Sequence, residues 1–207
     1  MAGGQAGSLQ VPGSSRLKAM SAWPTLSLPE WTVLTVVSEG PTHGFAIAQL
    51  TAPGGELGRI WQIPRPVIYR SIGRLLDLGL LTPRSVESGR GPQRTLYSIT
   101  RQGAAAVAHW LDTPVQHIRE VRSHLLLKLA LLDRTGGDPT GLLERQKAIL
   151  EPIADAINAE SPGSAGFDMT LLAWRRATTA ATMNFLGDLT RATSTAEMPV
   201  SSGTQAE

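Results

Sequence analysis

Apolar residues recur at helical spacing early in the chain, and the first such segment has clear boundaries. Ser27 followed three residues later by Glu30 is a capping-box pattern, and Pro29 falls in the first helical turn, where its missing N–H is harmless. Gly40 and Pro41 end the segment. These signals predict a first helix whose apolar stripe consists of Trp31, Val33, Leu34 and Val37.

Two more short helices are predicted next. Thr42 can cap a helix from His43 to Leu50, and the Pro53-Gly54-Gly55 run ends it. A third helix is predicted from about Pro66 to Leu78, with Gly79 in the left-handed position after its end. Its apolar residues are Val67, Ile68, Ile72, Leu75 and Leu76, and its other face is polar and basic, with Arg65, Tyr69, Arg70, Gly73 and Arg74.

After Leu80 the apolar period changes from about 3.6 residues to 2, which favours strands. Two polar strands, 80–87 and 94–99, flank the glycine-containing segment 88–92, and this arrangement is typical of a two-stranded ribbon. Thr100 can cap a fourth helix, and Pro114 lies beyond its end. Three short helices followed by a basic hairpin are typical of a winged helix-turn-helix domain.

The C-terminal half is expected to be helical. Leu125–Leu132 is apolar on almost every side except at Lys128, and two amphipathic segments follow, at 142–157 and 171–189. About 80 residues of such helices bury only part of their apolar surface alone, which favours a homodimer over a self-contained monomeric bundle. The predicted fold is mainly α with a small β-hairpin wing. Its parts are a tail (1–24), a winged helix-turn-helix domain (25–112), a helical dimerisation domain (113–191) and a second tail (192–207).

Charge is distributed unevenly, although the net charge is only +2. From Thr113 onward there are nine basic and eleven acidic residues, so the C-terminal half is slightly acidic. A local basic excess lies between residues 59 and 101. It is typical of a polyanion-binding surface, and the alternative is an ordinary solvated helix face. In this segment only Asp77 and Glu87 oppose eight arginines: Arg59, Arg65, Arg70, Arg74, Arg84, Arg90, Arg94 and Arg101.

Other classes of protein find little support. The chain has no cysteine, and its four histidines have no metal-ligand spacing, so we predict no metal site and no cofactor. No nucleophile elbow, P-loop or dinucleotide-binding fingerprint is present, so we predict no catalytic residues. No apolar run reaches the length of a membrane span, and the N-terminus lacks a signal-peptide pattern, so we expect a cytoplasmic location.

Seven residues are candidate DNA contacts. A tyrosine can stack or hydrogen-bond, and an arginine can bind phosphate or guanine, so the third helix supplies the main candidates. Two have local alternatives, since Arg74 could pair with Asp77 and His43 could be structural. Trp61 and Trp110 could line an effector pocket, but we expect core packing for each, and no effector site is assigned. The candidates are His43, Arg65, Tyr69, Arg70, Arg74, Arg90 and Arg94.

The chain resembles the PadR family of bacterial transcriptional regulators. Leu26–Leu50 carries a family-like run with its His43-Gly44-aromatic element, and IYRSIGRLLDLGLL looks like the family's recognition helix. GRGPQRTLYSITRQG resembles the wing and its exit, while REVRSHLLLKLALL and LLAWRRATTAATMNFLGDL resemble the helical C-terminal domain. Two positions depart from the family pattern: Phe45 stands where tyrosine is more usual, and Pro66 where a glycine or small residue is expected.

The resemblance implies a homodimer that binds double-stranded DNA and represses its own or a neighbouring gene. It also implies relief of repression by a small aromatic or hydrophobic effector. An inverted-repeat operator would match a two-fold symmetric dimer. The alternatives are a helical interaction module whose winged helix does not bind DNA specifically, and an enzyme.

Overall fold

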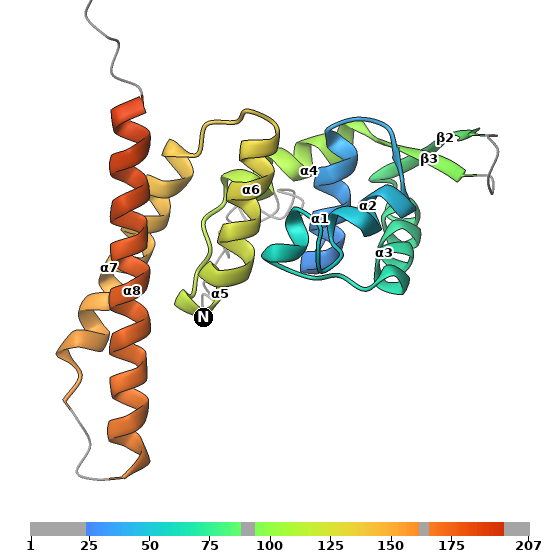
Figure 1. Ribbon diagram of the computed structural model, residues 1–207. Helices are drawn as coiled ribbons and strands as arrows, with labels where there is room; N and C mark the ends of the chain where they lie inside the picture. Colours follow the sequence, from blue (N-terminus) through green and yellow to red (C-terminus); the bar gives the residue numbers. More distant parts are fainter. Residues whose placement is uncertain (1–23, 88–93, 162–165, 197–207) are drawn as a thin grey trace, which may run out of the picture.

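The computed structural model describes residues 24–87, 94–161 and 166–196. Short helices and a small sheet form the N-terminal half, and two long helices lie side by side at the C-terminal end (Figure 1). The elements are α1 (Leu28–Ser38), β1 (Thr42–His43), α2 (Gly44–Leu50), η2 (Leu57–Arg59), α3 (Arg65–Asp77), β2 (Leu81–Glu87), β3 (Arg94–Ile99), α4 (Arg101–Asp112), α5 (Ile118–Glu120), η3 (Val121–Leu125), α6 (Leu126–Arg134), α7 (Thr140–Ala159) and α8 (Phe167–Ala196).

Helix α1 begins as its sequence predicts. The backbone N–H and the hydroxyl of Ser27 both donate to Glu30 Oε2, at 2.6 and 2.8 Å. The helix is buried on almost every side, with Val33 and Leu34 fully inaccessible to solvent. It forms the centre of the N-terminal core, against which α3, α4 and α6 pack.

Helices α2 and α3 lie close to their predicted bounds. The cap of α2 is His43 and not Thr42, because the helix begins at Gly44 and the ring of His43 accepts the Ala46 N–H. Pro66 lies in the first turn of α3, and Gly79 has a φ of +66°, the left-handed conformation predicted for it.

The predicted hairpin is present but is part of a larger sheet. Strand β3 pairs antiparallel with both β1 and β2, so the sheet order is β1-β3-β2. Pro83 is tolerated because β2 is an edge strand, and the register shifts between Pro83 and Ser85. Thr100 caps α4 by accepting the Gly103 N–H at 3.1 Å.

Helix α6 contributes to two cores. Leu127 and Leu131 join the N-terminal core, whereas Leu125, directly before α6, joins a second core formed with α7 and α8. The prediction that Leu125–Leu132 is buried on more than one face is therefore confirmed. The boundary at residues 112 and 113 stays a prediction, because α6 packs against the N-terminal core as well.

Ion pairs and hydrogen bonds also connect the two halves. Arg134 of α6 binds both carboxylate oxygens of Glu39, at 2.8 and 2.6 Å, and also pairs with Glu56. The hydrogen bond to Glu39, followed by the charges of Glu39 and Glu56, raises the pKa of Arg134 above its usual value, and burial opposes this rise only in part. Within the C-terminal half, Oε1 of Gln146 accepts the Val115 N–H at 2.7 Å and its Nε2 donates to the Val115 carbonyl at 2.9 Å.

The two tryptophans considered for an effector pocket differ. Trp110 is 8% exposed and belongs to the N-terminal core, as predicted. Trp61 is 42% exposed, so core packing was the wrong prediction for it. Trp61 precedes the loop into α3, and the nearby apolar position in the core is taken by Ile63.

Within residues 24–87, 94–161 and 166–196, no helix combines the length and the apolar character that a membrane span needs. Nor does that part of the chain bring three or more His, Asp or Glu side chains together as metal ligands.

Candidate nucleic-acid interface

Helix α3 divides into a buried and an exposed face. Ile68, Ile72 and Leu75 are at most 2% exposed and fasten the helix to the core. Arg65, Tyr69 and Arg70 lie on the exposed face, as the helical period predicts. Arg74 is exposed as well, so four of the seven candidate residues lie on the polar face of α3.

Phe45 of α2 lies between two arginines. The guanidinium carbon of Arg94, on β3, is 4.8 Å from the ring centroid, and that of Arg65 is 5.3 Å away. Arg65 also lies 5.7 Å from the Tyr69 ring. These distances are within the range of cation–π attraction, so Phe45 holds an arginine of α3 and an arginine of the wing on one surface.

Gly44 allows α2 and α3 to approach closely. A Cβ atom at this position would lie 2.9 Å from Tyr69 Cε1 and 3.0 Å from Ile72 Cδ1. The backbone of α2 therefore supports the Tyr69 ring, which is still 43% exposed. The Tyr69 ring thus contacts α2 on one side and remains open to solvent elsewhere.

His43 has both a structural and a surface role. Its Nδ1 accepts the Ala46 N–H at 3.0 Å, so the ring proton belongs on Nε2. Nε2 lies 3.3 Å from Arg94 Nη1. Since two donors then face each other, an acceptor from outside the chain would satisfy both.

Arg74 has a partner within the fold. Its Nε lies 3.0 Å from Oε1 of Glu30, whose side chain is only 11% exposed. This contact joins α3 to the first turn of α1, and the suggested pairing with Asp77 is not the one formed. A DNA contact by Arg74 stays a prediction.

The remaining candidates have different surroundings. Arg70 is exposed and makes no ion pair with any residue in the described ranges. Arg94 begins β3, opposite Glu87. Arg90 lies outside the described residues, so its predicted role in the wing is open. Arg59 and Arg101 are exposed and flank the segment that contains α3 and the hairpin.

Phe45 is the residue that sequence analysis did not include among the candidates. Sequence analysis named it only as a departure from the family pattern, and the structure shows it partly buried. An available signal was the aromatic residue directly after His43-Gly44, near a basic helix and a basic strand. The pairing of that ring with arginines 20 and 49 positions away required the three-dimensional structure.

A short basic helix, held on a helical core beside a β-hairpin, defines a winged helix-turn-helix protein. Residues 33–109 match the model of the transcriptional regulator PadR-like family. This segment therefore matches the family that the sequence resembles.

The chain is also similar to several solved structures. Bacillus subtilis PadR in complex with operator DNA is 18% identical, with a TM-score of 0.42, over 82% of this chain and 99% of that one. The same protein with p-coumaric acid is 17% identical, with a TM-score of 0.39, over 81% and 99%. The Vibrio cholerae virulence activator AphA is 20% identical, with a TM-score of 0.35, over 82% and 95%. A comparison with curated protein sequences finds no match.

Proposed function

We propose that the protein is a transcriptional repressor that binds an inverted-repeat operator as a homodimer and is released by a small-molecule effector. The observation that carries the DNA-binding part is the position of Phe45 between Arg65 and Arg94. This ring brings cations of the proposed recognition helix and of the wing onto one exposed surface. The match to a family of transcriptional regulators supports the same conclusion.

The exposed face of α3 suits a major groove roughly 12 Å wide. Tyr69 and Arg70 project from the middle of this face and are the proposed base contacts. Arg65 lies at the start of the helix and Arg94 at the start of β3, where they would bind phosphates on either side. His43 Nε2 and Arg94 Nη1 would share one phosphate oxygen, which removes the conflict between two facing donors.

The proposed dimer uses the first half of α8. The side chains of Phe167 and Trp174 are 75% and 66% exposed, and Met169 and Leu171 are 53% and 43% exposed. A run of large exposed apolar residues on one helix is typical of an interaction surface. A second copy would cover it and place two recognition helices about one DNA turn apart, roughly 34 Å.

DNA binding can be tested by fluorescence anisotropy with duplexes from the region upstream of the protein's own gene. We expect one fragment to bind in the presence of excess competitor DNA. Arg70→Ala should weaken that binding about tenfold or more. Arg94→Ala should weaken binding to all duplexes and lower the salt slope by roughly one unit. Arg145→Ala, in α7, is the matched control, because this arginine pairs with Asp112 away from α3.

Two results would contradict the proposal. The first is no binding to any duplex at low salt, which would favour a helical interaction module. The second is an unchanged affinity for both Arg70→Ala and Arg94→Ala. Light scattering tests the dimer separately, and Leu171→Asp should shift the protein toward monomer. A monomeric wild-type protein at micromolar concentration would exclude the dimer.

A further inference from the structure

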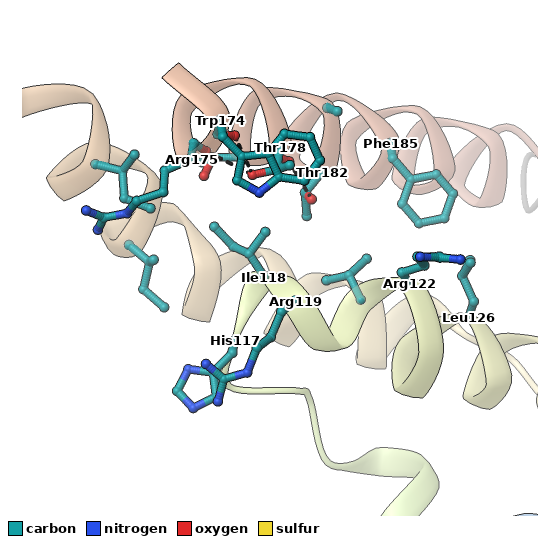
Figure 2. A pocket seen from close by; sticks show the side chains of 15 residues that line it. His117, Ile118, Arg119, Arg122, Leu126, Trp174, Arg175, Thr178, Thr182 and Phe185 are labelled. Carbon is teal, nitrogen blue, oxygen red and sulfur yellow. Dashed lines mark hydrogen bonds between the residues drawn. The ribbon is translucent and has the colours of Figure 1, made fainter. Parts of the chain in front are cut away.

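A cavity of about 750 Å³ lies between α8 and the segment formed by α5 and η3, with α7 behind it (Figure 2). Its volume is within the range of small-molecule sites, roughly 300 to 1,000 Å³. It is distant from the Phe45 surface and belongs to the second core. The apolar residues that line it are Ile118, Val121, Leu126, Ile153, Ile157, Trp174, Ala181 and Phe185.

The charged groups of this cavity are all basic. Its lining includes Arg119, Arg122, Arg175 and His117, and no carboxylate. The charge of Arg175 is already paired with Glu160 at 2.6 Å. Arg119 turns away from α8 toward His117, whereas Arg122 extends toward Phe185 (Figure 2).

Arg122 is therefore the cation available to a bound molecule. It is exposed and has no ion pair with any residue in the described part of the chain. An arginine next to apolar walls favours a carboxylate or a similar anion, because its planar group can donate two parallel hydrogen bonds. This charge arrangement selects against cationic molecules.

Thr179 is a second and independent indication of a ligand. Its side chain lines the cavity, is 1% exposed, and has a hydroxyl without a hydrogen-bond partner. The neighbouring hydroxyls are satisfied within α8, since Thr178 donates to Trp174 O and Thr182 donates to Thr178 O. A buried hydroxyl without a partner is costly, and a ligand oxygen in the cavity would relieve that cost.

The wall opposite α8 has an unusual backbone. Val121–Leu125 forms a π-helical turn, a conformation that is rare and is found often at functional sites. Val121 and Arg122 of this turn both line the cavity. The π-helical turn and Arg122 therefore belong to the same site.

We propose that this cavity binds an amphipathic organic anion, with its apolar body between α8 and η3 and its anionic group at Arg122. Thr179 provides a further hydrogen bond inside the cavity. The binding itself does not depend on DNA; only its role as the effector site rests on the function proposed above.

Isothermal titration calorimetry of the full chain without DNA tests the proposal, with decanoate and decylamine as probes of equal chain length. We expect decanoate to bind at least about tenfold more tightly than decylamine, a difference of roughly 1.4 kcal/mol. Arg122→Gln should weaken decanoate binding about tenfold, and Arg122→Lys should restore part of it.

The threonines supply a matched pair of variants. Thr179→Val should weaken decanoate binding and also raise the melting temperature of the free protein, because an unpaired buried hydroxyl is removed. Thr182→Val should not raise it, since that hydroxyl already has an acceptor. A merely structural role for Thr179 would not change both quantities in these directions.

Three results would overturn the proposal. They are no decanoate binding, equal affinity for decanoate and decylamine, and undiminished binding by both Arg122→Gln and Thr179→Val. A second copy of the chain that fills the cavity would prevent decanoate binding. The calorimetry contains no DNA. Decanoate can therefore bind even if the protein does not bind DNA, so the two proposals can fail separately.

Discussion

Trp31 of α1 and Trp110 of α4 stack face to face, with ring centroids 5.2 Å apart and planes 7° from parallel. Lys128 of α6 lies on the Trp110 ring, with its Nζ 4.8 Å from the centroid. The same ammonium donates to the Thr113 carbonyl. This stack therefore joins the winged-helix core to the helix that leads into the C-terminal half.

Replacing Trp110 tests how much the stack stabilises the fold. Trp110→Ala should lower the free energy of unfolding by about 3–5 kcal/mol, because a large buried ring is removed and a cavity remains. Chemical denaturation measures this difference. Trp61→Ala is the matched control and should change stability by less than about 0.5 kcal/mol, because Trp61 is exposed. Equal losses of stability for Trp110→Ala and Trp61→Ala would contradict the assignment of Trp110 to the core.

The charge of Lys128 should make stability depend on pH. Burial lowers the pKa of Lys128 from 10.5 to about 8, and the carboxylates of Glu120 and Asp112 oppose this only in part. Between about pH 8 and pH 10.5 the unfolded chain keeps a proton that the folded chain has released. The free energy of unfolding should therefore rise with pH in this interval, by up to about 1.4 kcal/mol per pH unit.

Below about pH 8 both states hold the proton and the cost of burying it is constant. Lys128→Met keeps most of the side-chain volume, so the difference in slope between this variant and the wild type isolates the ammonium. Lys147→Met is the control, since Lys147 is half-exposed and pairs with Glu151 on the surface of α7. Identical slopes for wild type and Lys128→Met would rule out a lowered pKa.

Two glycines near the interface should respond differently to alanine. Gly44→Ala places a methyl group 2.9 Å from Tyr69 Cε1, so the ring must move. We expect a loss of about 1–3 kcal/mol in stability and weaker DNA binding. Gly73→Ala meets nothing within 4 Å and replaces a glycine inside α3, so stability should rise by up to about 1 kcal/mol. Thermal denaturation distinguishes the two, and a gain in stability for Gly44→Ala would contradict the tight contact.

The elements of the winged helix could be predicted from sequence because their signals are local. Ser27 with Glu30, Gly79 and Thr100 each mark a boundary through residues that are close in the chain, and the structure places all three as predicted. Strand β1 was missed because two residues carry no period, and their pairing with Tyr97 and Leu96 spans about 50 positions.

The candidate site was only partly predictable for the same reason. The exposed face of α3 follows from the helical period, so Arg65, Tyr69 and Arg70 could be named. The position of Arg94 beside Phe45 depends on how the sheet packs against α2, which no local pattern encodes. The cavity at Arg122 likewise forms between segments that are far apart in the sequence, since Arg122 and Trp174 are 52 positions apart, and Trp174 is neither of the two tryptophans that sequence analysis considered.

Arg70 and Arg74 are four residues apart on α3, but their surroundings predict opposite effects of mutation. Arg74→Ala removes the 3.0 Å contact to the nearly buried Glu30, so stability should fall by up to about 1 kcal/mol, with a smaller effect at high salt. Arg70→Ala removes no ion pair with a described residue, so stability should change by less than about 0.5 kcal/mol while DNA affinity falls about tenfold or more. Denaturation and anisotropy on the same two variants separate these effects. If Arg74→Ala instead loses as much DNA affinity as Arg70→Ala at unchanged stability, then Arg74 leaves Glu30 to bind DNA, as its sequence position first suggested.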